Sequence, residues 1–438
     1  MKTAIVLGAA YGGSRAAQIL AARIPKGWRI LLIDRNSHAN HVYVLPRFSV
    51  LSGHEHKAFI PYHSVFQPPK DDHLALHATV LSLTAKSVTL SRSFPEHGID
   101  KTEVPYDYAI YALGSHLPVP LDLWGTSEDR AYDGTKAKAI QWLKEKQKVI
   151  GRAGSVLVVG GGALGIRQSL TPRHFEPGSL ESEFATDIAA VYPSKKITLL
   201  HSRNRLLPRF DERMHLETLQ SLESHGIDVI LGERLDTSSA DKYNEAGQRV
   251  VSTLSGRDIA TDLMLLCTGQ KPNIALLKDM DPNTVDVQTG LARVLRTLQL
   301  SDLKTDPDTL PADLAKISLD GSADPVQDEG KAKTHYPHIF AIGDAADTFG
   351  AIKAGHNAYF QGEVAARNVL RLINDSDEPL ELYTPGLPAI KVSLGLTRAV
   401  YQVDGVIGVN NDGVEDLQAP AVWAYYGIQV EGEDGMYD

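Results

Sequence analysis

The stretch that decides the fold is Ala4-Ile5-Val6-Leu7-Gly8-Ala9-Ala10-Tyr11-Gly12-Gly13, an apolar run that leads into a glycine-rich turn. Residues 3–7 have the pattern of a buried strand, and the alanine-rich residues 14–22 predict a helix. The turn between them needs residues with little or no side chain, because backbone N–H groups must approach a pyrophosphate at the helix N-terminus. The residues that meet this need are Gly8, Ala10, Gly12 and Gly13. The stretch therefore predicts a dinucleotide site.

A second strand, residues 28–33, completes this unit and ends at Asp34, which is followed by Arg35. An acid at this position can accept hydrogen bonds from both ribose hydroxyls of an adenine dinucleotide. Strand, turn, helix, strand and acid in register make the prediction specific, and we include Asp34 and Arg35 among the candidate cofactor contacts.

Two later segments fit the same nucleotide. Residues 106–111 and 339–342 read as strands, and each ends in small residues or an acid. Ligands of open α/β sheets bind at the carboxyl ends of the strands. We assign Asp344 to the ribityl or pyrophosphate region of a long cofactor, with a helix over about 354–372 behind it; the alternative is that Asp344 only caps that helix. The candidate contacts from these two segments are Ala112, Gly114, Gly343 and Asp344.

A second glycine turn, Val156-Leu157-Val158-Val159-Gly160-Gly161-Gly162-Ala163-Leu164-Gly165-Ile166, is complete but interrupted. Gly160, Gly162 and Gly165 match G-x-G-x-x-G, and a helix should follow. Pro172 and Pro177 stand there instead, and each would cost about 3 kcal/mol inside a helix. We therefore expect this segment to loop out.

The interruption corresponds to residues 167–182. If these residues are set aside, Ile166 joins Glu183, and residues 183–191 have a helical apolar face. Gly165 and Ser202 are then the same number of residues apart in the sequence as Gly13 and Asp34 are. Three possibilities stay open: the loop bulges outward and NAD(P)H binds weakly, the site is disabled, or the loop is a functional lid. A gene-model or splicing artefact would also explain the inserted sequence.

The residue in register with Asp34 in the second unit is Ser202, followed by Arg203. Without an acid, the site would not repel a 2′-phosphate, and Arg203 could pair with one. This predicts that NADPH is accepted, alongside NADH. The alternative is that Arg203 is a solvated surface charge.

These motifs resemble the flavoproteins with two dinucleotide-binding domains, in the turn at 8–13, Asp34, residues 112–115, residues 266–269 with Gly269, and Gly343-Asp344. Within that superfamily, residues 40–48 and 350–356 are similar to the apoptosis-inducing-factor-like group, which includes the ferroptosis suppressor proteins, and fungal members look closest. The resemblance covers about residues 1–400.

The resemblance implies FAD at the first site, NAD(P)H at the second and a quinone or similar small molecule as electron acceptor. In this group a glutamate follows the third glycine by two positions; position 167 is arginine, so Glu183 is the candidate for that role. Disulfide reductases of the superfamily need a Cys-x-x-Cys, whereas Cys267 is the only cysteine here. Electrons would therefore pass directly to an outside acceptor.

Lys353, nine residues after Asp344, is the candidate catalytic residue. A cation beside the isoalloxazine could stabilise negative charge or orient a quinone carbonyl; the alternative is a surface lysine. His356 could relay protons, although helix packing is the plainer interpretation.

The bulk composition limits the partners. The 438 residues carry a formal net charge of −10, which disfavours nucleic acid. No apolar run reaches about 18 residues, so we expect no transmembrane segment and at most peripheral membrane contact. The N-terminus leaves no room for a secretory signal, and Lys2 excludes myristoylation. We expect a cytoplasmic monomer or homodimer, with association to the mitochondrial surface left open, and assign no metal site.

The predicted fold class is α/β, with two Rossmann-like domains, one inserted in the other, and a small C-terminal α+β domain. The FAD-binding domain is split over 1–122 and 265–375, the NAD(P)H-binding domain spans 123–264, and the C-terminal domain spans 376–438. Residues 301–332 are acidic and read as a flexible surface insertion.

The sequence thus predicts an FAD-dependent NAD(P)H oxidoreductase. Two alternatives remain: a flavin-binding redox sensor or interaction protein with little turnover, and a flavin oxidase of specialised metabolism that uses oxygen.

Overall fold

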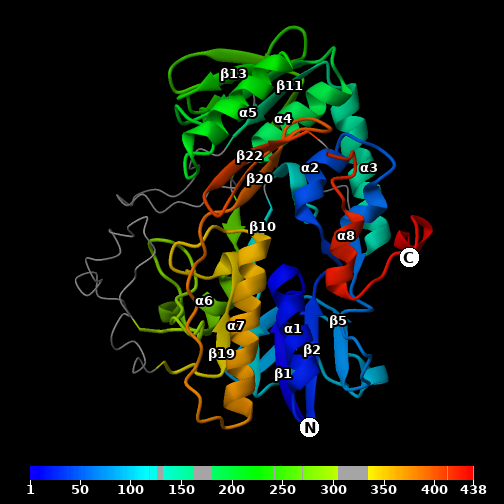
Figure 1. The fold of residues 1–438 in the computed structure, drawn as a ribbon, viewed down its shortest axis with the longest axis vertical. Coiled ribbons are helices and arrows are strands. Elements are labelled where there is room, and N and C mark those ends of the chain that lie inside the picture. The colour runs from blue at the N-terminus through cyan, green and yellow to red at the C-terminus, as the bar shows by residue number, and fades with distance from the viewer. Residues whose placement is uncertain are drawn as a thin grey trace.

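The computed structural model describes residues 1–117, 119–125, 132–160, 180–239, 242–268, 270–303, 334–411 and 413–437. Two α/β units lie at opposite ends of the molecule, and the C-terminal segments run between them (Figure 1). The inserted prolines Pro172 and Pro177 and most of the acidic stretch 301–332 lie outside the described residues.

The first unit is built on a five-stranded parallel sheet in the order β19-β9-β1-β2-β5. Its central strand β1 is buried after Lys2, as its unbroken apolar sequence predicts for a sheet covered on both faces. The strands of this sheet are β1 (Lys2–Leu7), β2 (Trp28–Asp34), β5 (His73–His77), β9 (Tyr108–Tyr111) and β19 (Ile339–Ala341).

Helices α1 (Tyr11–Arg23) and α7 (Gly355–Ile373) lie side by side against this sheet (Figure 1). They approach closely because glycine stands at the crossing. A Cβ on Gly12 would lie 2.5 Å from the carbonyl oxygen of Ala358, and a Cβ on Gly362 would overlap the carbonyl of Gly12. The second glycine of the predicted turn therefore also sets how α7 packs on α1.

The second unit has a four-stranded parallel sheet in the order β13-β12-β11-β17. The apolar runs at 156–159, 196–201 and 263–266 form strands, and the helix indicated by the pattern of residues 183–191 is confirmed. The elements of this unit are α3 (Lys136–Arg152), β11 (Ser155–Val159), α4 (Leu180–Val191), β12 (Lys196–His201), α5 (Glu212–Ser224), β13 (Asp228–Leu231) and β17 (Leu263–Leu266).

Smaller antiparallel sheets and short helices complete the described residues. These are β3 (His38–Asn40) with β4 (Phe59–Pro61); β6 (Val80–Leu83), β7 (Ser87–Leu90) and β8 (Glu103–Pro105); β10 (Ser115–His116) with β18 (Lys271–Pro272); β14 (Lys242–Tyr243), β15 (Arg249–Ser252) and β16 (Asp258–Thr261); β20 (Ile390–Ser393), β21 (Ala399–Val403) and β22 (Val406–Asn410); and α2 (Leu45–Phe48), α6 (Ala275–Met280) and α8 (Pro420–Trp423).

The C-terminal segments share the cores of both units. Val392 and Val400 of the β20-β21-β22 sheet pack in one core with Phe184 of α4. Trp423 and Tyr426 instead pack in the core of the first unit. Residues after 376 therefore join the two α/β units. The domain boundaries given above stay predictions.

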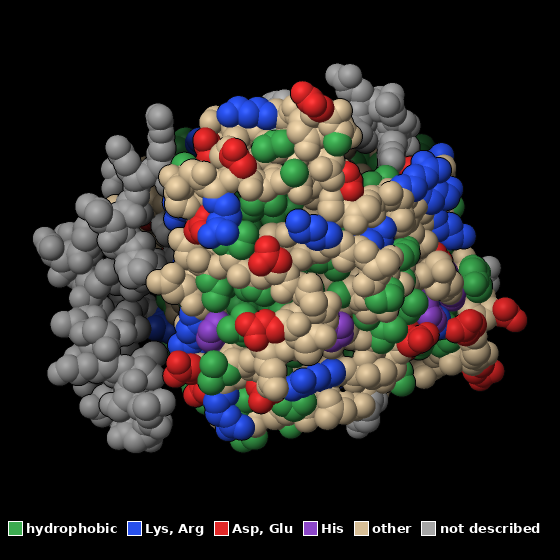
Figure 2. All heavy atoms as spheres, turned by 90° about the horizontal axis from the view of Figure 1, so that it is seen from above, with side chains coloured by type: hydrophobic (Ala, Val, Ile, Leu, Met, Phe, Trp, Pro, Cys, Tyr) green, Lys and Arg blue, Asp and Glu red, His purple; other side chains and the backbone are tan. Residues whose placement is uncertain are grey.

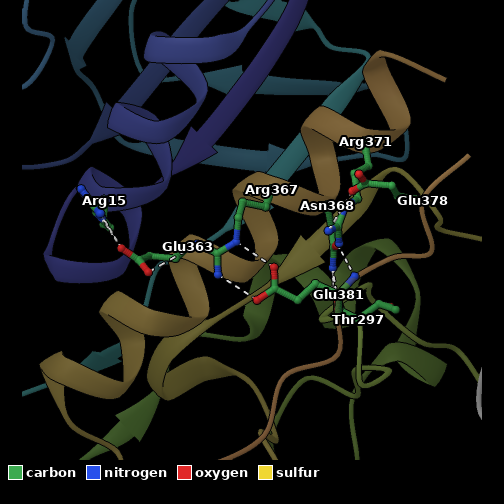
Figure 3. A network of polar contacts seen from close by, with 8 residues as sticks. All are labelled: Arg15, Thr297, Glu363, Arg367, Asn368, Arg371, Glu378 and Glu381. Carbon is green, nitrogen blue, oxygen red and sulfur yellow. Dashed lines mark hydrogen bonds and ion pairs between the residues drawn. The ribbon is translucent and has the colours of Figure 1, made fainter. Parts of the chain in front are cut away.

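A polar network fixes α7 to its surroundings (Figure 3). Arg15 of α1 donates to Glu363 at 2.7 Å, and Arg367 donates to both carboxylate oxygens of Glu381. Asn368 is fully buried and binds the backbone of Thr297 and Glu381. The chain leaving α7 toward the C-terminal sheet is thus held by side chains of α7 itself.

The fold class predicted from the sequence is confirmed: two parallel-sheet units with Rossmann-like order. Within the part of the chain that the structure describes, no helix is both long and apolar enough to cross a bilayer. Figure 2 views the molecule from the end that carries the second unit. On this face, positive and negative side chains of the described residues are interspersed.

Candidate functional site

One large cavity lies between the two units and the C-terminal segments. Its volume is about 1180 Å³. A pocket for a single drug-sized ligand usually reaches at most about 1,000 Å³. The wall is formed by the first glycine turn, the segments that end β2, β9 and β19, the start of α4 and the C-terminal loops. The cavity thus has room for more than one bound group.

The first glycine turn fits a dinucleotide pyrophosphate. Gly8 has φ +93°, and a Cβ there would overlap the carbonyl oxygen of Ala112, while a Cβ on Gly13 would overlap the carbonyl of Gly8. Ala10, the N-cap of α1, makes no side-chain capping hydrogen bond. The first N–H groups of α1 are therefore left for an anion, with the positive end of the helix dipole behind them.

Asp34 ends β2 in the cavity wall, as the sequence predicts. Its two carboxylate oxygens accept from the backbone N–H of Ala9 at 2.8 Å and of Asn36 at 2.7 Å. Burial raises the pKa of Asp34, and these hydrogen bonds oppose the rise. The Asn36 side-chain amide also donates to Oδ1, at 3.1 Å, so Oδ2 is the oxygen that keeps a lone pair for a ribose hydroxyl. The neighbouring Arg35 also lines the cavity and lies 4.8 Å from the ring centroid of Trp124.

The carboxyl ends of β9 and β19 meet at Asp344. Its Oδ2 accepts from the Ser115 hydroxyl at 2.9 Å, and that hydroxyl accepts from the Gln270 amide at 2.7 Å. Burial raises the pKa of Asp344, opposed by Lys353 and Ser115. Ala112, Gly114 and Gly343 line the cavity beside it. Gln270 was not predicted, although its place just after β17, at the carboxyl edge of the second sheet, is a recognisable signal.

Lys353 lies in the cavity wall and is half-buried, so it is not a solvated surface lysine. Its Nζ donates to the carbonyl oxygen of Ala346. Burial lowers the pKa of Lys353, and the carboxylates of Asp344 and Asp347 oppose that shift. His356 also lines the cavity, and burial lowers its pKa.

Glu183 lies in the first turn of α4 and faces the same cavity. The backbone N–H of Ser393 donates to its Oε1 at 3.2 Å. Tyr43 interacts with the carboxylates of Asp344 and Glu183. Burial raises the pKa of Tyr43 to about 12, and these two carboxylates add to the rise, whereas the hydrogen bond from the Gly355 N–H opposes it. The structure therefore brings Glu183 of the second unit to the acids and tyrosine of the first.

An aromatic wall, which we define as Tyr11, Tyr43, Tyr359, Phe360 and Tyr425, was missed by sequence reasoning as a site feature. All five side chains line the cavity. Tyr11 and Tyr43 have ring centroids 5.7 Å apart, and Tyr359 lies edge-on to both Phe360 and Tyr425. Tyr43 falls within the motif 40–48, which was its only sequence signal.

The remaining candidates of the second unit are placed apart from this cavity or are not described. Gly160 is buried after β11, and its N–H donates to the carbonyl oxygen of Leu200 at 2.8 Å. Ser202 and the exposed Arg203 follow β12 and are not among the described residues that line the cavity. Gly162, Gly165 and Gly269 lie outside the described residues.

Comparisons with known proteins agree with this geometry. The family model described as pyridine nucleotide-disulphide oxidoreductase matches residues 2–294. Fe-regulated protein 8 of Mycosarcoma maydis is 39% identical over 439 residues, covering 98% of this chain and 96% of that protein. Ferroptosis suppressor protein 1 of Mus musculus is 27% identical over 408 residues, covering 92% of this chain and 88% of that protein.

A solved structure shows the same fold. The water-forming NADH oxidase from Lactobacillus brevis bound to NADH aligns with a TM-score of 0.57 at 19% identity, covering 92% of this chain and 75% of that chain. The chain therefore belongs to the pyridine nucleotide-disulphide oxidoreductase family, and FAD and NAD(P)H are the cofactors of these oxidoreductases.

Proposed function

We propose that this protein is an FAD-dependent NAD(P)H oxidoreductase that delivers electrons to a quinone or a similar small acceptor. The observation that carries the proposal is the shared cavity of about 1180 Å³. It joins the glycine turn and Asp34, Asp344 and Lys353, Glu183 of the second unit and the aromatic wall. A site that only stored a flavin would not need Glu183 or the aromatic wall.

The first unit holds the cofactor in this proposal. The α1 N-terminus binds the pyrophosphate, Asp34 the adenosine ribose, and Asp344 the ribityl side, with Ser115 and Gln270 fixing the Asp344 carboxylate. When bound, FAD supplies the capacity to take up and release two electrons. The chain supplies position, a water-poor wall and compensating charge.

Glu183 and Lys353 are the charged groups that we assign to the reacting end. Glu183 offers carboxylate oxygen to an amide such as that of nicotinamide and is oriented by the Ser393 N–H. Lys353 holds positive charge against the cavity wall and can stabilise negative charge on a bound group or orient an acceptor carbonyl. Cys267 is buried directly after β17 and takes no part in the proposed reaction.

The aromatic wall supports a flat, apolar acceptor. Tyr43, Phe360 and Tyr425 are 47%, 55% and 60% exposed, so they line an opening to solvent. Aromatic rings stack well with other flat rings. A quinone fits this surface, and it is also the acceptor that the resemblance to the apoptosis-inducing-factor-like group implies.

The nucleotide preference rests on Ser202 and Arg203. Both follow β12, the position at which an acid would repel a 2′-phosphate. We propose that NADPH is used alongside NADH. A strict preference for NADH would contradict this part of the proposal.

Steady-state turnover tests the acceptor. The FAD-loaded protein should oxidise NADPH several times faster with a soluble short-chain quinone than with oxygen alone. Turnover with oxygen that the quinone does not increase would favour an oxidase, and absence of turnover with either acceptor would favour a redox sensor or interaction protein.

A further inference from the structure

A buried ion pair, which we call the clamp, joins Arg47 of α2 to Asp187 of α4. Arg47 Nε and Asp187 Oδ1 are 2.9 Å apart, and both side chains are 0% exposed. Removing two charges from water costs as much as, or more than, the pair returns. The clamp is therefore poorly explained as a device for stability alone.

The remaining nitrogen atoms of Arg47 reach the C-terminal segments. Nη2 donates to the carbonyl oxygen of Gly395 at 2.6 Å, and Nη1 donates to those of Leu396 and Glu415 at 3.2 and 3.1 Å. One guanidinium thus ties the first unit to α4, to the loop before β21 and to the segment after β22. The planar geometry of arginine suits such divided bonding, which lysine could not reproduce.

The clamp holds both partners of the Glu183–Ser393 contact. Glu183 and Asp187 are one helical turn apart on the same face of α4. Ser393, which donates to Glu183, ends β20 just before Gly395, which accepts from Arg47. The position of the Glu183 carboxylate in the cavity therefore depends on α4 and β20 together, and Arg47 binds both.

More residues separate β11 from the described part of α4 than separate β1 from α1. In the first unit, β1 ends at Leu7 and α1 begins at Tyr11. In the second unit, β11 ends at Val159, and α4 is described from Leu180 onward. A long connection restrains the start of a helix less than a short one does. The tertiary contacts of α4 therefore matter more for its position.

We infer that Arg47 and Asp187 are positioning residues, which hold α4 so that Glu183 meets the nicotinamide end of the bound dinucleotide. This inference rests on the proposed function. The clamp binds α4 one helical turn after Glu183, on the same face, and supplies there a restraint like the one that the glycine turn provides in the first unit. It acts through Glu183 and does not touch the bound groups itself.

The test compares Asp187→Ala with Thr186→Val in the FAD-loaded protein. Thr186 is equally buried on α4, and its hydroxyl donates within the same helix, to the backbone carbonyl oxygens of Ser182 and Glu183, so it is a matched control that does not contact Arg47. Binding of oxidised NADP⁺, measured by calorimetry, should weaken at least ten-fold in Asp187→Ala and stay within two-fold in Thr186→Val. The FAD content should not change in either variant.

A half-reaction measurement separates positioning from general damage. Asp187→Ala should slow reduction by NADPH at least ten-fold, while reoxidation of the dithionite-reduced protein by a quinone stays at the wild-type rate. Asp187→Glu, which keeps the charge, should recover part of the loss. Equal slowing of both half-reactions, or equal effects in Thr186→Val, would overturn the inference.

A second variant guards against misfolding, because Asp187→Ala leaves a buried guanidinium unpaired. Arg47→Met combined with Asp187→Leu removes both charges. If this double variant is folded and binds NADP⁺ as the wild type does, the clamp has no positioning role. If the wild type itself neither binds NADP⁺ nor accepts electrons from NADPH or NADH, the proposed function fails first, and this inference fails with it.

Discussion

Individual charged residues in this molecule are placed where water is scarce, and burial shifts their pKa values toward the neutral forms. Asp34 and Asp344 have raised pKa values and Lys353 a lowered one, each chiefly because of burial. Such shifts concentrate at functional sites, where charge must be held without solvent. Lys353 is the residue for which this matters most, because it faces the reacting end of the cavity.

We expect Lys353→Met to slow acceptor reduction roughly 10- to 100-fold, the usual effect of removing one stabilising group from a reacting centre. FAD content should stay close to that of the wild type, since the side chain bonds only to Ala346. Lys391→Met, at an exposed lysine on the same cavity, is the control. Unchanged turnover in Lys353→Met would remove this residue from the mechanism.

His38 gives a prediction about stability. It is fully buried, and burial lowers its pKa to about 3. The unfolded chain takes up a proton below about pH 6.5 and the folded chain does not, so stability falls as the pH falls, by about 2 kcal/mol per such group at pH 5. His38→Gln should lose less stability between pH 7 and pH 5, as measured by denaturant midpoints. An identical pH dependence would contradict the assignment.

At the scale of elements, the packing of α7 on α1 connects the glycine turn to the rest of the fold. Gly12 belongs both to the turn that we propose for the cofactor and to the helix crossing, so the turn and the crossing cannot vary independently. The network around Asn368 then fixes the far part of α7 to the chain that leads into the C-terminal sheet (Figure 3). Each contact gives a separate prediction.

Gly362→Ala tests the crossing. Its Cβ would overlap the carbonyl of Gly12, and relief of that overlap would displace the turn. We expect a loss of about 1–3 kcal/mol, typical of overpacking, together with a lower FAD content. Gly386→Ala, where a Cβ meets nothing within 4 Å, should change neither quantity. Full FAD content in a destabilised Gly362→Ala would show that the crossing and the site are independent.

Asn368→Ala tests the network. The change leaves the carbonyl oxygens of Thr297 and Glu381 and the Glu381 N–H without their buried partner, at a cost of roughly 2–4 kcal/mol. Arg371→Ala removes an ion pair with the exposed Glu378 and should cost less than about 0.5 kcal/mol. Thermal unfolding of both variants tests this prediction. Similar losses of stability would mean that the buried Asn368 amide contributes no more to stability than the exposed ion pair does.

At the scale of the whole molecule, the sequence predicted what is local and missed what is brought together from afar. Both parallel sheets follow from short apolar runs with glycine turns or acids at their ends. Glu183 was found from the resemblance, which implies a glutamate after the third glycine, and from the helical pattern of residues 183–191. Tyr425 could not be found, because it reaches the cavity from a segment whose own sequence carries no repeated pattern.

The C-terminal segment shows the same limit most clearly. Residues 390–393 form strand β20, but nothing in their sequence indicates that Val392 packs with Phe184 or that Arg47 binds the following loop. Apolar periodicity says that a residue is buried and not which partner buries it. Sharing of the C-terminal segment between two cores is therefore a result of the tertiary structure.

Anaerobic mixing of the FAD-loaded protein with NADPH, and separately with NADH, tests the central claim most directly. The shared cavity predicts rapid loss of the oxidised flavin absorbance with NADPH, and with NADH as well, before any acceptor is added. An oxidised flavin spectrum that persists with both nucleotides would contradict the account and leave the protein a flavin-binding sensor.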